Sequence, residues 1–283
     1  MSFQLAKART FLFVPGNRPD RFAKAFGSGA DSVVLDLEDA VPPGAKATAR
    51  TAIEAAWLEL QALGVPLVVR INTPEHAEGH ADLEWLAKLP APAGVMVPKV
   101  ETPATLMPVR ARLPDVPILP LIESAAGWAA LPQIASAHGV LRIVVGHIDF
   151  MADTGMQCAR DEAELGPLRF AVAMWTRIHR LAPAVDGVST TIHDDELLGE
   201  DTRRAMRYGF GAKLCIHPRQ VPIVHAALAP APEELDWAQR VVAADAAANG
   251  AAVQLDGRMV DAPVVLHALR LLARSGVRAS AAS

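Results

Sequence analysis

The chain of 283 residues is predicted to fold as a (β/α)8 TIM barrel, an α/β fold, with a C-terminal helical extension. Short apolar runs recur along the chain, and each is followed by a polar turn and a segment with helix-like spacing, which predicts parallel strands joined by helices. Small aliphatic side chains dominate the runs and only 5% of the residues are aromatic, a composition that suits strands buried on both faces. No glycine-rich phosphate-binding motif opens a helical segment, which disfavours an open nucleotide-binding sheet.

The apolar runs give the expected strands in order along the chain. They lie at 10–14, 32–37, 67–71, 94–98, 117–122, 142–146, 184–188 and 212–216. Helix-like spacing lies between them, for example at 44–63 and 160–182. Eight such units, alternating with about eight helices, fit a closed barrel better than an open doubly wound sheet.

The pattern changes after residue 217, where prolines become frequent. Helices are expected at about 218–228, 233–248 and 261–275. Before the last of these lies an extended stretch in which Asp256-Gly257 indicates a turn. We therefore divide the chain into a catalytic barrel domain, 1–228, and an extension or lid, 229–283. The extension exceeds what closes a barrel, so we expect it to pack over its own barrel or that of a neighbouring subunit.

The composition excludes several classes of protein. A chain that is 51% hydrophobic is not intrinsically disordered, and a net charge of −4 disfavours binding to nucleic acid. No apolar run approaches the roughly 18 to 20 residues of a membrane span, and the N-terminus lacks the apolar core of a signal peptide. Cys158 and Cys215 match no metal-ligand spacing. These features predict a cytoplasmic protein with reduced thiols.

Polar or ionisable groups follow nearly every expected strand. In a TIM barrel the reactive groups lie at these carboxyl ends. The groups are Arg18, then Asp36, Glu38 and Asp39, Arg70 and Asn72, Lys99 and Glu101, Glu123, His147 and Asp149, and His217. With only 20% of residues charged, chance would not usually produce this pattern, so it predicts an enzyme more than a scaffold.

Glu123, Asp149 and Arg70 form the most specific group among these residues. Glu123 and Asp149 follow adjacent strands and could share Mg²⁺, which proteins usually hold with one or two carboxylates plus substrate and water oxygens. Arg70 offers a two-pronged donor for a substrate carboxylate. Together they imply a metal-chelating substrate such as a 2-oxo acid, with an enolate stabilised during C–C cleavage or proton abstraction. For each residue alone, the alternative is a structural ion pair at the rim.

The segment DLEDAV adds further carboxylates to the second strand end. At least one of them is expected to enter the mouth of the barrel, and Asp39 is a candidate catalytic group. The alternatives are that Asp39 caps a turn and that Glu38 holds Arg70. A Schiff-base role for Lys99 has no supporting context, and His217 is expected to make an ordinary hydrogen bond.

Several motifs, taken together, resemble one known family. FVPGNRPDRFAKA, VVLDLEDAV, RINT, VPKVE, LIESAAG and FGAKLCIHPRQ occur in this order and are similar to those of the citrate lyase β-subunit-like family, in the HpcH/HpaI aldolase group. The likeness runs from about residue 9 to the segment DGRMVDAP. It implies a TIM barrel, commonly in homotrimers or hexamers, that acts on CoA thioesters.

The resemblance also implies roles for particular residues. Glu123 and Asp149 correspond to the Mg²⁺ ligands, and Arg70 to the residue that binds the oxo-acid carboxylate. Asp261 matches an aspartate that reaches the site of a neighbouring subunit for acid–base work. The residues expected near the CoA phosphates are Arg18, Arg21, Lys24 and Lys46.

Two positions depart from the family pattern. Ile148 stands directly before Asp149, where the family usually carries glutamate, and Arg258 stands where lysine is common. The first change removes a charge near the expected metal. The lining near Ile148 and the segment 189–191 is therefore expected to set the acyl specificity.

The resulting functional prediction is a Mg²⁺-dependent carbon–carbon lyase. It would cleave a 3-hydroxy-acyl-CoA, similar to malyl-, citramalyl- or citryl-CoA, into an acyl-CoA and a 2-oxo acid. The alternatives are a thioesterase of the malyl-CoA type, a CoA-free 2-oxo-acid aldolase, and a non-catalytic binding or regulatory subunit. The expected partners are CoA esters and 2-oxo acids, with no nucleic acid and no membrane.

Overall fold

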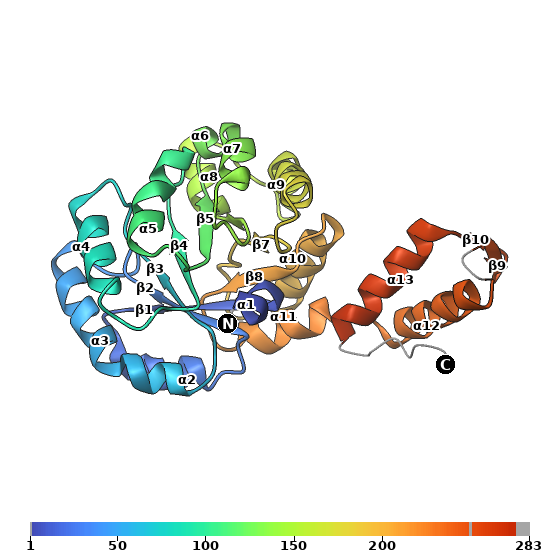
Figure 1. Cartoon of the computed structure of the whole chain (residues 1–283), viewed down its shortest axis with the longest axis horizontal. Coiled ribbons are helices and arrows are strands. Elements are labelled where there is room, and N and C mark those ends of the chain that lie inside the picture. Colours follow the sequence, from blue (N-terminus) through green and yellow to red (C-terminus); the bar gives the residue numbers. More distant parts are fainter. Residues whose placement is uncertain (1, 249–250, 276–283) are drawn as a thin grey trace. The chain divides into compact units, whose positions relative to one another are not determined.

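Parallel strands form a closed barrel in the computed structural model, which describes residues 2–248 and 251–275 (Figure 1). The strands are β1 (Thr10–Pro15), β2 (Ser32–Asp36), β3 (Leu67–Arg70), β4 (Gly94–Val97), β5 (Ile118–Ile122), β6 (Val144–Val145), β7 (Val185–Asp186) and β8 (Ala212–Cys215). Each pairs with its neighbours in chain order, and β1 pairs with β8 to close the ring. The predicted TIM barrel and its strands are confirmed.

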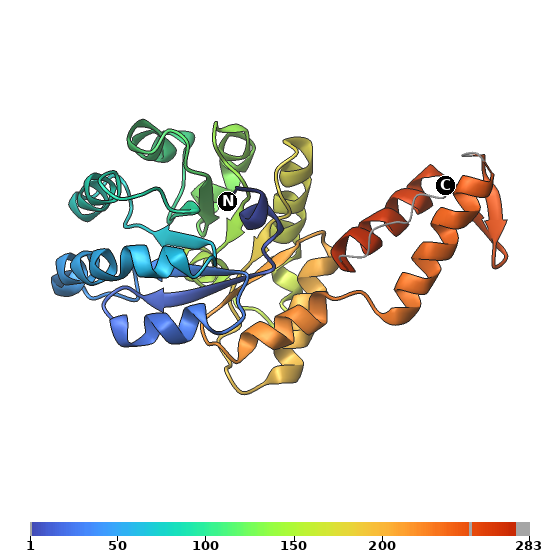
Figure 2. The same cartoon turned by 60° about the horizontal axis from the view of Figure 1, so that its bottom comes forward.

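The helices surround the strands, as the turned view in Figure 2 shows. They are α1 (Ser2–Lys7), α2 (Phe22–Phe26), α3 (Lys46–Ala62), α4 (Ala77–Leu86), α5 (Met107–Arg112), α6 (Ala125–Ala129), α7 (Leu131–Ser136), α8 (His147–Thr154), α9 (Gly166–Ile178), α10 (Asp195–Arg207) and α11 (Gln220–Leu228). Short 3-10 turns are η1 (Pro19–Arg21), η2 (Pro43–Ala45), η3 (Pro103–Leu106) and η4 (Ala163–Leu165).

Two strands are followed by more helices than a simple alternation predicts. Both α6 and α7 follow β5, and Pro132 lies in the first turn of α7, where its missing N–H costs no helical hydrogen bond. Both α8 and α9 follow β6. The strand β6 covers only Val144–Val145 of the apolar run at 142–146, and α8 begins directly after that run, at His147. This extra helix carries the candidate metal ligand Asp149.

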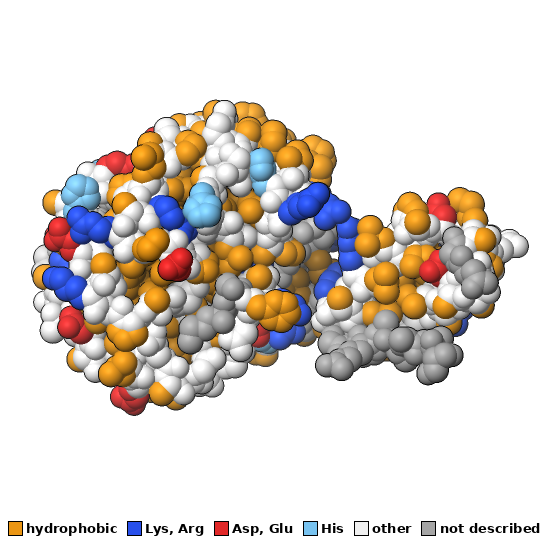
Figure 3. Space-filling model, in the orientation of Figure 1, with side chains coloured by type: hydrophobic (Ala, Val, Ile, Leu, Met, Phe, Trp, Pro, Cys, Tyr) orange, Lys and Arg blue, Asp and Glu red, His pale blue; other side chains and the backbone are white. Residues whose placement is uncertain are grey.

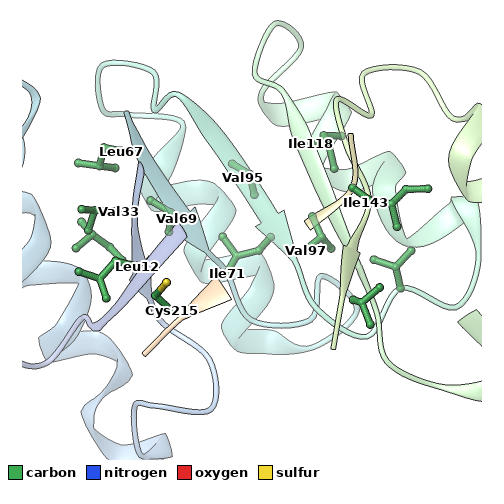
Figure 4. Packing of buried hydrophobic residues seen from close by; sticks show 14 of the residues in the cluster. Leu12, Val33, Leu67, Val69, Ile71, Val95, Val97, Ile118, Ile143 and Cys215 are labelled. Carbon is green, nitrogen blue, oxygen red and sulfur yellow. The ribbon is translucent and has the colours of Figure 1, made fainter. Parts of the chain in front are cut away.

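The side chains of the strands form two packed layers. The layer between strands and helices contains alternate residues such as Val33, Val69 and Val97 (Figure 4). The layer inside the barrel contains the intervening residues, such as Val34 and Val68. Since successive strand residues point to opposite faces, this inward set continues toward the carboxyl end. Small aliphatic side chains fill both layers, as the composition suggested.

The inward set ends in charged residues. Val34 is followed two positions later by Asp36, Val68 by Arg70, and Leu121 by Glu123. The side chains of Asp36 and Glu123 are nearly completely buried. The alternation of the strands thus places ionisable groups directly above the inner core, at the face where TIM barrels carry their sites.

At the opposite face of the barrel, Arg142 is completely buried without a carboxylate partner. Its guanidinium donates hydrogen bonds to the carbonyls of Leu5 (3.1 Å), Ala8 (2.8 Å) and Pro183 (2.8 Å). These residues precede β1 and β7, so one side chain links the segments that begin two strands. The Phe11 ring lies 5.2 Å from the guanidinium carbon and contributes a cation–π contact.

The C-terminal part is a separate compact unit, Ala229–Ser283. It contains α12 (Pro232–Ala247), β9 (Val253–Leu255), β10 (Arg258–Val260) and α13 (Ala262–Ser275). The two strands form an antiparallel hairpin, and the φ angles of 49° at Asp256 and 75° at Gly257 confirm the expected turn there. The helices α12 and α13 lie side by side and bury Ala238, Val241 and Leu271 between them (Figures 1 and 2).

The surface of the barrel carries side chains of mixed character. On the face in Figure 3, acidic, basic and hydrophobic side chains are interspersed over the barrel. No helix within residues 2–248 and 251–275 has the length and apolar character needed to cross a bilayer. Cys158 and Cys215 are both free thiols.

We predict that Arg142→Met destabilises the barrel. The substitution leaves buried carbonyl oxygens without donors, each worth about 1–3 kcal/mol, partly offset by removal of a buried charge. The midpoint of thermal unfolding should fall by about 5–10 °C. The control is Arg112→Met, because the Arg112 side chain is half exposed and lies 3.7 Å from Glu84. An equal effect of the two substitutions in thermal unfolding would contradict the role of Arg142.

Candidate active site

A buried ion pair joins the ends of β2 and β3. Asp36 and Arg70 are register partners on these parallel strands and share the inward face. Arg70 donates from Nε to Asp36 Oδ1 (2.7 Å) and from Nη2 to Asp36 Oδ2 (2.6 Å). The edge of Arg70 that was expected to receive a substrate carboxylate is therefore occupied by Asp36. A substrate would have to use the remaining N–H groups of this guanidinium.

Glu38 connects Arg70 to Lys99. One Glu38 oxygen lies 2.9 Å from Arg70 Nη1, as the sequence suggested, and the other is paired with Lys99 Nζ. Burial raises the pKa of Glu38, and Arg70 and Lys99 only partly offset this effect. Burial lowers the pKa of Lys99, but Glu38 and Asp39 outweigh it, so the net pKa is raised. The neighbouring carboxylates thus favour the charged form of Lys99.

Glu123 is the most perturbed carboxyl group in the mouth. Its side chain is buried, and Oε1 accepts a hydrogen bond of 2.6 Å from the backbone N–H of Lys99. Lys99 adopts a left-handed φ of 51°, an unusual conformation for this residue type, and in it the N–H points to Glu123. Burial, with the negative charges of Glu38 and Asp149, raises the pKa of Glu123 to about 8.

Asp149 contributes its charge to the same group from the helix that follows β6. It lies in the first turn of α8, not on β6 itself, and the partial positive charge of a helix N-terminus favours a carboxylate there. Gly146 allows Glu123 to pack against the backbone between β6 and α8, because a Cβ at this position would lie 2.5 Å from Glu123 Oε2. The structure therefore brings together Glu123 and Asp149 from β5 and α8.

The donor set fits a divalent cation with oxygen ligands. Carboxylates are ligands that Mg²⁺ prefers, and two of them leave positions for substrate and water. Burial is the main cause of the raised pKa of Glu123, and the charges of Glu38 and Asp149 raise it further; a bound cation would oppose both effects. No group of three or more His, Cys, Asp and Glu residues is arranged to hold a metal in the described part of the chain. A site with two protein ligands is consistent with that finding.

A second feature is a basic cluster beside the mouth, formed by Arg21, Lys24, His193, His217 and Arg219. Burial lowers the pKa of His217, and Lys24, Arg219, His193 and Arg21 lower it further, which places these groups close together. The cluster combines the segments after β1, β7 and β8, and β8 lies between the other two strands in the barrel. Arg21, Lys24 and Arg219 are exposed. Such a cluster can bind a phosphate-bearing ligand.

Arg18 and Lys46, the other residues expected near phosphates, have partners within the chain. Arg18 is exposed and makes two hydrogen bonds to Asp20, of 2.9 Å and 2.7 Å. Lys46 is partly buried and donates to the carbonyls of Leu37 and Glu38 and to the side chain of Asn72. Lys46 therefore fixes the loop after β2, and its contact with a phosphate stays a prediction.

The two remaining candidates, Asp39 and Asp261, lie in different units. Asp39 is half exposed and lies 3.4 Å from Lys99 Nζ. Burial raises the pKa of Asp39, but Glu38 and the charges of Lys99 and Arg70 outweigh it, so the net pKa is lowered and Asp39 is a weak base. Asp261 begins α13, where its Oδ1 accepts a hydrogen bond of 3.4 Å from the N–H of Val264. Its catalytic role stays a prediction.

Three contributors to the site escaped the sequence reasoning. The contributions of the Lys99 backbone N–H and of Gly146 cannot be predicted from residue types, because they depend on the backbone conformation. Arg219 does have one, because it belongs to the motif CIHPRQ, and its Nη1 lies 3.1 Å from Nδ1 of His193. His193 itself lies in a stretch interpreted as a helix start, and Asp194 does cap α10 by accepting from the N–H of Leu197 at 2.9 Å.

Comparisons of the sequence with known proteins agree with this geometry. A family described as HpcH/HpaI aldolase/citrate lyase matches residues 9–218. The citrate lyase subunit beta-like protein of Mycobacterium tuberculosis is 37% identical over 275 residues, which cover 94% of this chain and 95% of the relative. The (3S)-malyl-CoA thioesterase of Cereibacter sphaeroides is 32% identical over 279 residues, which cover 97% of each chain.

A solved structure extends the likeness to three dimensions. The protein CitE from Mycobacterium tuberculosis, in complex with magnesium, acetoacetate and coenzyme A, matches with a TM-score of 0.83 and 36% identity. The match covers 96% of this chain and 99% of that one. The resemblance carried by the motifs is confirmed, and the chain belongs to the HpcH/HpaI aldolase/citrate lyase family.

Proposed function

We propose that this protein is a Mg²⁺-dependent lyase that cleaves a 3-hydroxy-acyl-CoA into an acyl-CoA and a 2-oxo acid. The observation that carries the proposal is the group formed by Glu123, Asp149 and Glu38 beside Arg70, in which burial, with the negative charges of Glu38 and Asp149, raises the pKa of Glu123 to about 8. The solved relative that holds magnesium, acetoacetate and coenzyme A supports both the cofactor and the substrate class.

Glu123 and Asp149 would hold the Mg²⁺. Bound there, the ion would act as a Lewis acid toward the hydroxyl and carboxylate oxygens of the substrate. Arg70 would orient the substrate carboxylate through the N–H groups that Asp36 and Glu38 leave free. Because Asp36 fixes the guanidinium from one side, Arg70 is preorganised for that contact.

The carboxylates of the mouth supply candidates for proton transfer. Of the two residues after β2, Glu38 has a raised pKa and Asp39 a lowered one, so Glu38 is the better base for the substrate hydroxyl proton. Loss of that proton lets the hydroxyl carbon become the carbonyl of the oxo acid. The breaking C–C bond leaves its electron pair on the thioester enolate. Asp261 would give the enolate its proton, from a neighbouring subunit in a homotrimer or hexamer.

The basic cluster would bind the CoA phosphates. Arg21 and Lys24 come from the motif that the resemblance associates with CoA, and His217 and Arg219 face them from the segment after β8. This arrangement explains how an acidic protein in the cytoplasm could bind a highly anionic ligand, because the positive charge is local.

Hydrolysis of the thioester is a second candidate reaction. The relative named (3S)-malyl-CoA thioesterase shares 32% identity over 97% of this chain, so the same framework supports a thioesterase in that protein. In that reaction water would attack the thioester carbonyl or an intermediate derived from it. The products distinguish the candidates, because hydrolysis yields free CoA without an oxo acid.

The test is turnover of purified protein on malyl-, citramalyl-, methylmalyl- and citryl-CoA, with products identified by mass spectrometry. We expect an acyl-CoA and a 2-oxo acid together, dependent on Mg²⁺. Glu123→Gln should lower kcat by about 100-fold or more, since it weakens the metal site without changing its shape. The matched control, Glu84→Gln, changes an exposed residue and should leave turnover intact.

The same experiment separates the alternatives. Turnover that survives both chelation and Glu123→Gln would exclude the metal proposal. Free CoA alone would indicate the thioesterase, and cleavage of hydroxy-oxo acids without CoA would indicate an aldolase. Metal-dependent binding of the esters without any product would indicate a non-catalytic subunit.

Binding of Mg²⁺ should release a proton at neutral pH. With a pKa of about 8, Glu123 is about nine-tenths protonated at pH 7, and its proton must leave before the carboxylate can bind the ion. The affinity for Mg²⁺ should therefore rise about tenfold per pH unit below pH 8 and level off above it. Calorimetric titrations in buffers of different ionisation enthalpy measure this release. Absence of proton release at pH 7 in the native protein would contradict the assignment.

Asp261→Asn tests the acid–base proposal without disturbing the fold. Asparagine caps helices as well as aspartate, so α13 keeps its cap while the carboxyl group is lost. We expect kcat to fall by about 100-fold with a small change in KM. The midpoint of thermal unfolding should stay within about 2 °C.

Mixed oligomers test whether Asp261 acts across subunits. Co-expressed Asp261→Asn and Glu123→Gln chains would form some sites with an intact Glu123 from one subunit and an intact Asp261 from the other. Activity should then reappear although each variant alone is inactive. Mixed oligomers that remain inactive would show that Asp261 does not complete a neighbour's site.

A further inference from the structure

A cavity of about 530 Å³ is lined in part by α8, the helix that carries the candidate metal ligand Asp149. One wall is a face of α8, formed by Ile148, Met151 and Ala152, which are spaced three and four residues apart. The other walls come from the segments 156–162 and 188–191 and from the start of α10. Asp149 follows Ile148 directly, so the cavity begins one residue before a proposed metal ligand.

The carboxylates in the cavity wall are already paired. Glu162 accepts from Arg169 at 2.5 Å and from Arg204 at 2.7 Å. Asp201 accepts from Arg204 at 2.8 Å and from the Ser189 hydroxyl at 2.5 Å. These negative charges are therefore neutralised within the protein, and they do not call for a cationic ligand.

A buried ionic network holds Glu162, one of the carboxylates of the cavity wall, in position. Arg169 also binds Asp186 at 3.0 Å, and Lys213 Nζ lies 3.4 Å from the same carboxylate. Burial raises the pKa of Asp186, but Lys213 and Arg169 outweigh it and lower it to about 2. Because the network joins β7, β8 and α9, the cavity is formed before any ligand arrives.

The rest of the lining is mixed, with apolar side chains from α8 and polar ones that include His147, Gln157, Thr190 and Thr191. Met156, Val188 and Leu197 contribute hydrophobic surface, and the Ile148 side chain is 41% exposed. The only arginine in the lining, Arg160, is 70% exposed. An apolar ligand group would gain stability by covering Ile148 and its neighbours, whereas the cations that face the buried carboxylates of the wall are already paired with them.

We infer that this cavity binds an alkyl substituent on the hydroxyl-bearing carbon of the substrate, and that Ile148 sets the specificity. The inference rests on the proposed function and names its substrate class. The 2-oxo acid released would carry an apolar side chain larger than the methyl group of pyruvate, and not a second carboxylate. The carboxylate and oxygen of that acid would reach Glu123 and Asp149, while its side chain extends past Ile148.

Binding of 2-oxo acids to the whole protein with saturating Mg²⁺, measured by calorimetry, tests this inference. The series is pyruvate, 2-oxobutanoate, 3-methyl-2-oxobutanoate and 4-methyl-2-oxopentanoate, with oxaloacetate as the acidic comparison. We expect affinity to rise about fourfold per methylene up to the branched acids. Oxaloacetate should bind more weakly than the branched acids.

Two variants separate charge from volume. Ile148→Glu should weaken the branched acids by about tenfold or more while pyruvate changes by about twofold at most. Ala152→Phe, which fills the cavity without adding charge, should also discriminate against the branched acids. The matched control is Ile178→Glu, the same change at an exposed position outside the cavity. Retained pyruvate binding shows that each variant is folded.

The outcomes distinguish this inference from the function on which it rests. Equal affinity along the series, or an equal loss for every acid in Ile148→Glu, would overturn the inference and leave the lyase proposal standing. If no oxo acid binds with Mg²⁺ and no CoA ester is turned over, the proposed function is wrong and the inference falls with it. A rise in affinity with chain length that Ile148→Glu abolishes supports the assignment.

Discussion

The mouth of the barrel holds more negative charge than its own cations can neutralise. Five carboxyl groups lie at the ends of β2 and β5 and the start of α8, against two cations: Asp36, Glu38, Asp39, Glu123 and Asp149 face Arg70 and Lys99. Arg70 is bound on two sides, by Asp36 and Glu38. Burial, with the charges of Glu38 and Asp149, favours the protonated form of Glu123, whose pKa rises to about 8. A cation bound here, as the proposed function requires, would relieve the repulsion among these carboxylates.

The framework that holds it follows from the alternation within parallel strands. The inner layer of small aliphatic side chains is continued by Asp36, Arg70 and Glu123 because each lies two residues beyond a buried valine or leucine. This part could be predicted from the sequence, because the sequence shows where the strands lie and which alternate residues share a face. The family resemblance added the expected ligand roles of Glu123 and Asp149, whose charges lie close enough to interact, and these roles stay a proposal.

Other parts of the site could not be predicted, for identifiable physical reasons. The pairing of Arg70 with Asp36 depends on the register between β2 and β3, which residue types alone do not define. The hydrogen bond from Lys99 to Glu123 depends on a left-handed backbone conformation at a lysine. The basic cluster combines residues about 200 positions apart that become neighbours only when β1 pairs with β8. The features that could not be predicted from the sequence are thus the register between distant strands and the unusual backbone conformations.

The exchange at Ile148 fits both the electrostatics of the mouth and the shape of the cavity. A glutamate at this position, as the family usually has, would add a negative charge beside Asp149 and raise the pKa of Glu123 further. Isoleucine leaves the charge as it is and adds apolar surface to the wall of the cavity. Loss of a metal ligand would argue for a protein without catalysis, but Glu123 and Asp149 are both retained. The change is better explained as a change in the substrate than as a loss of the reaction.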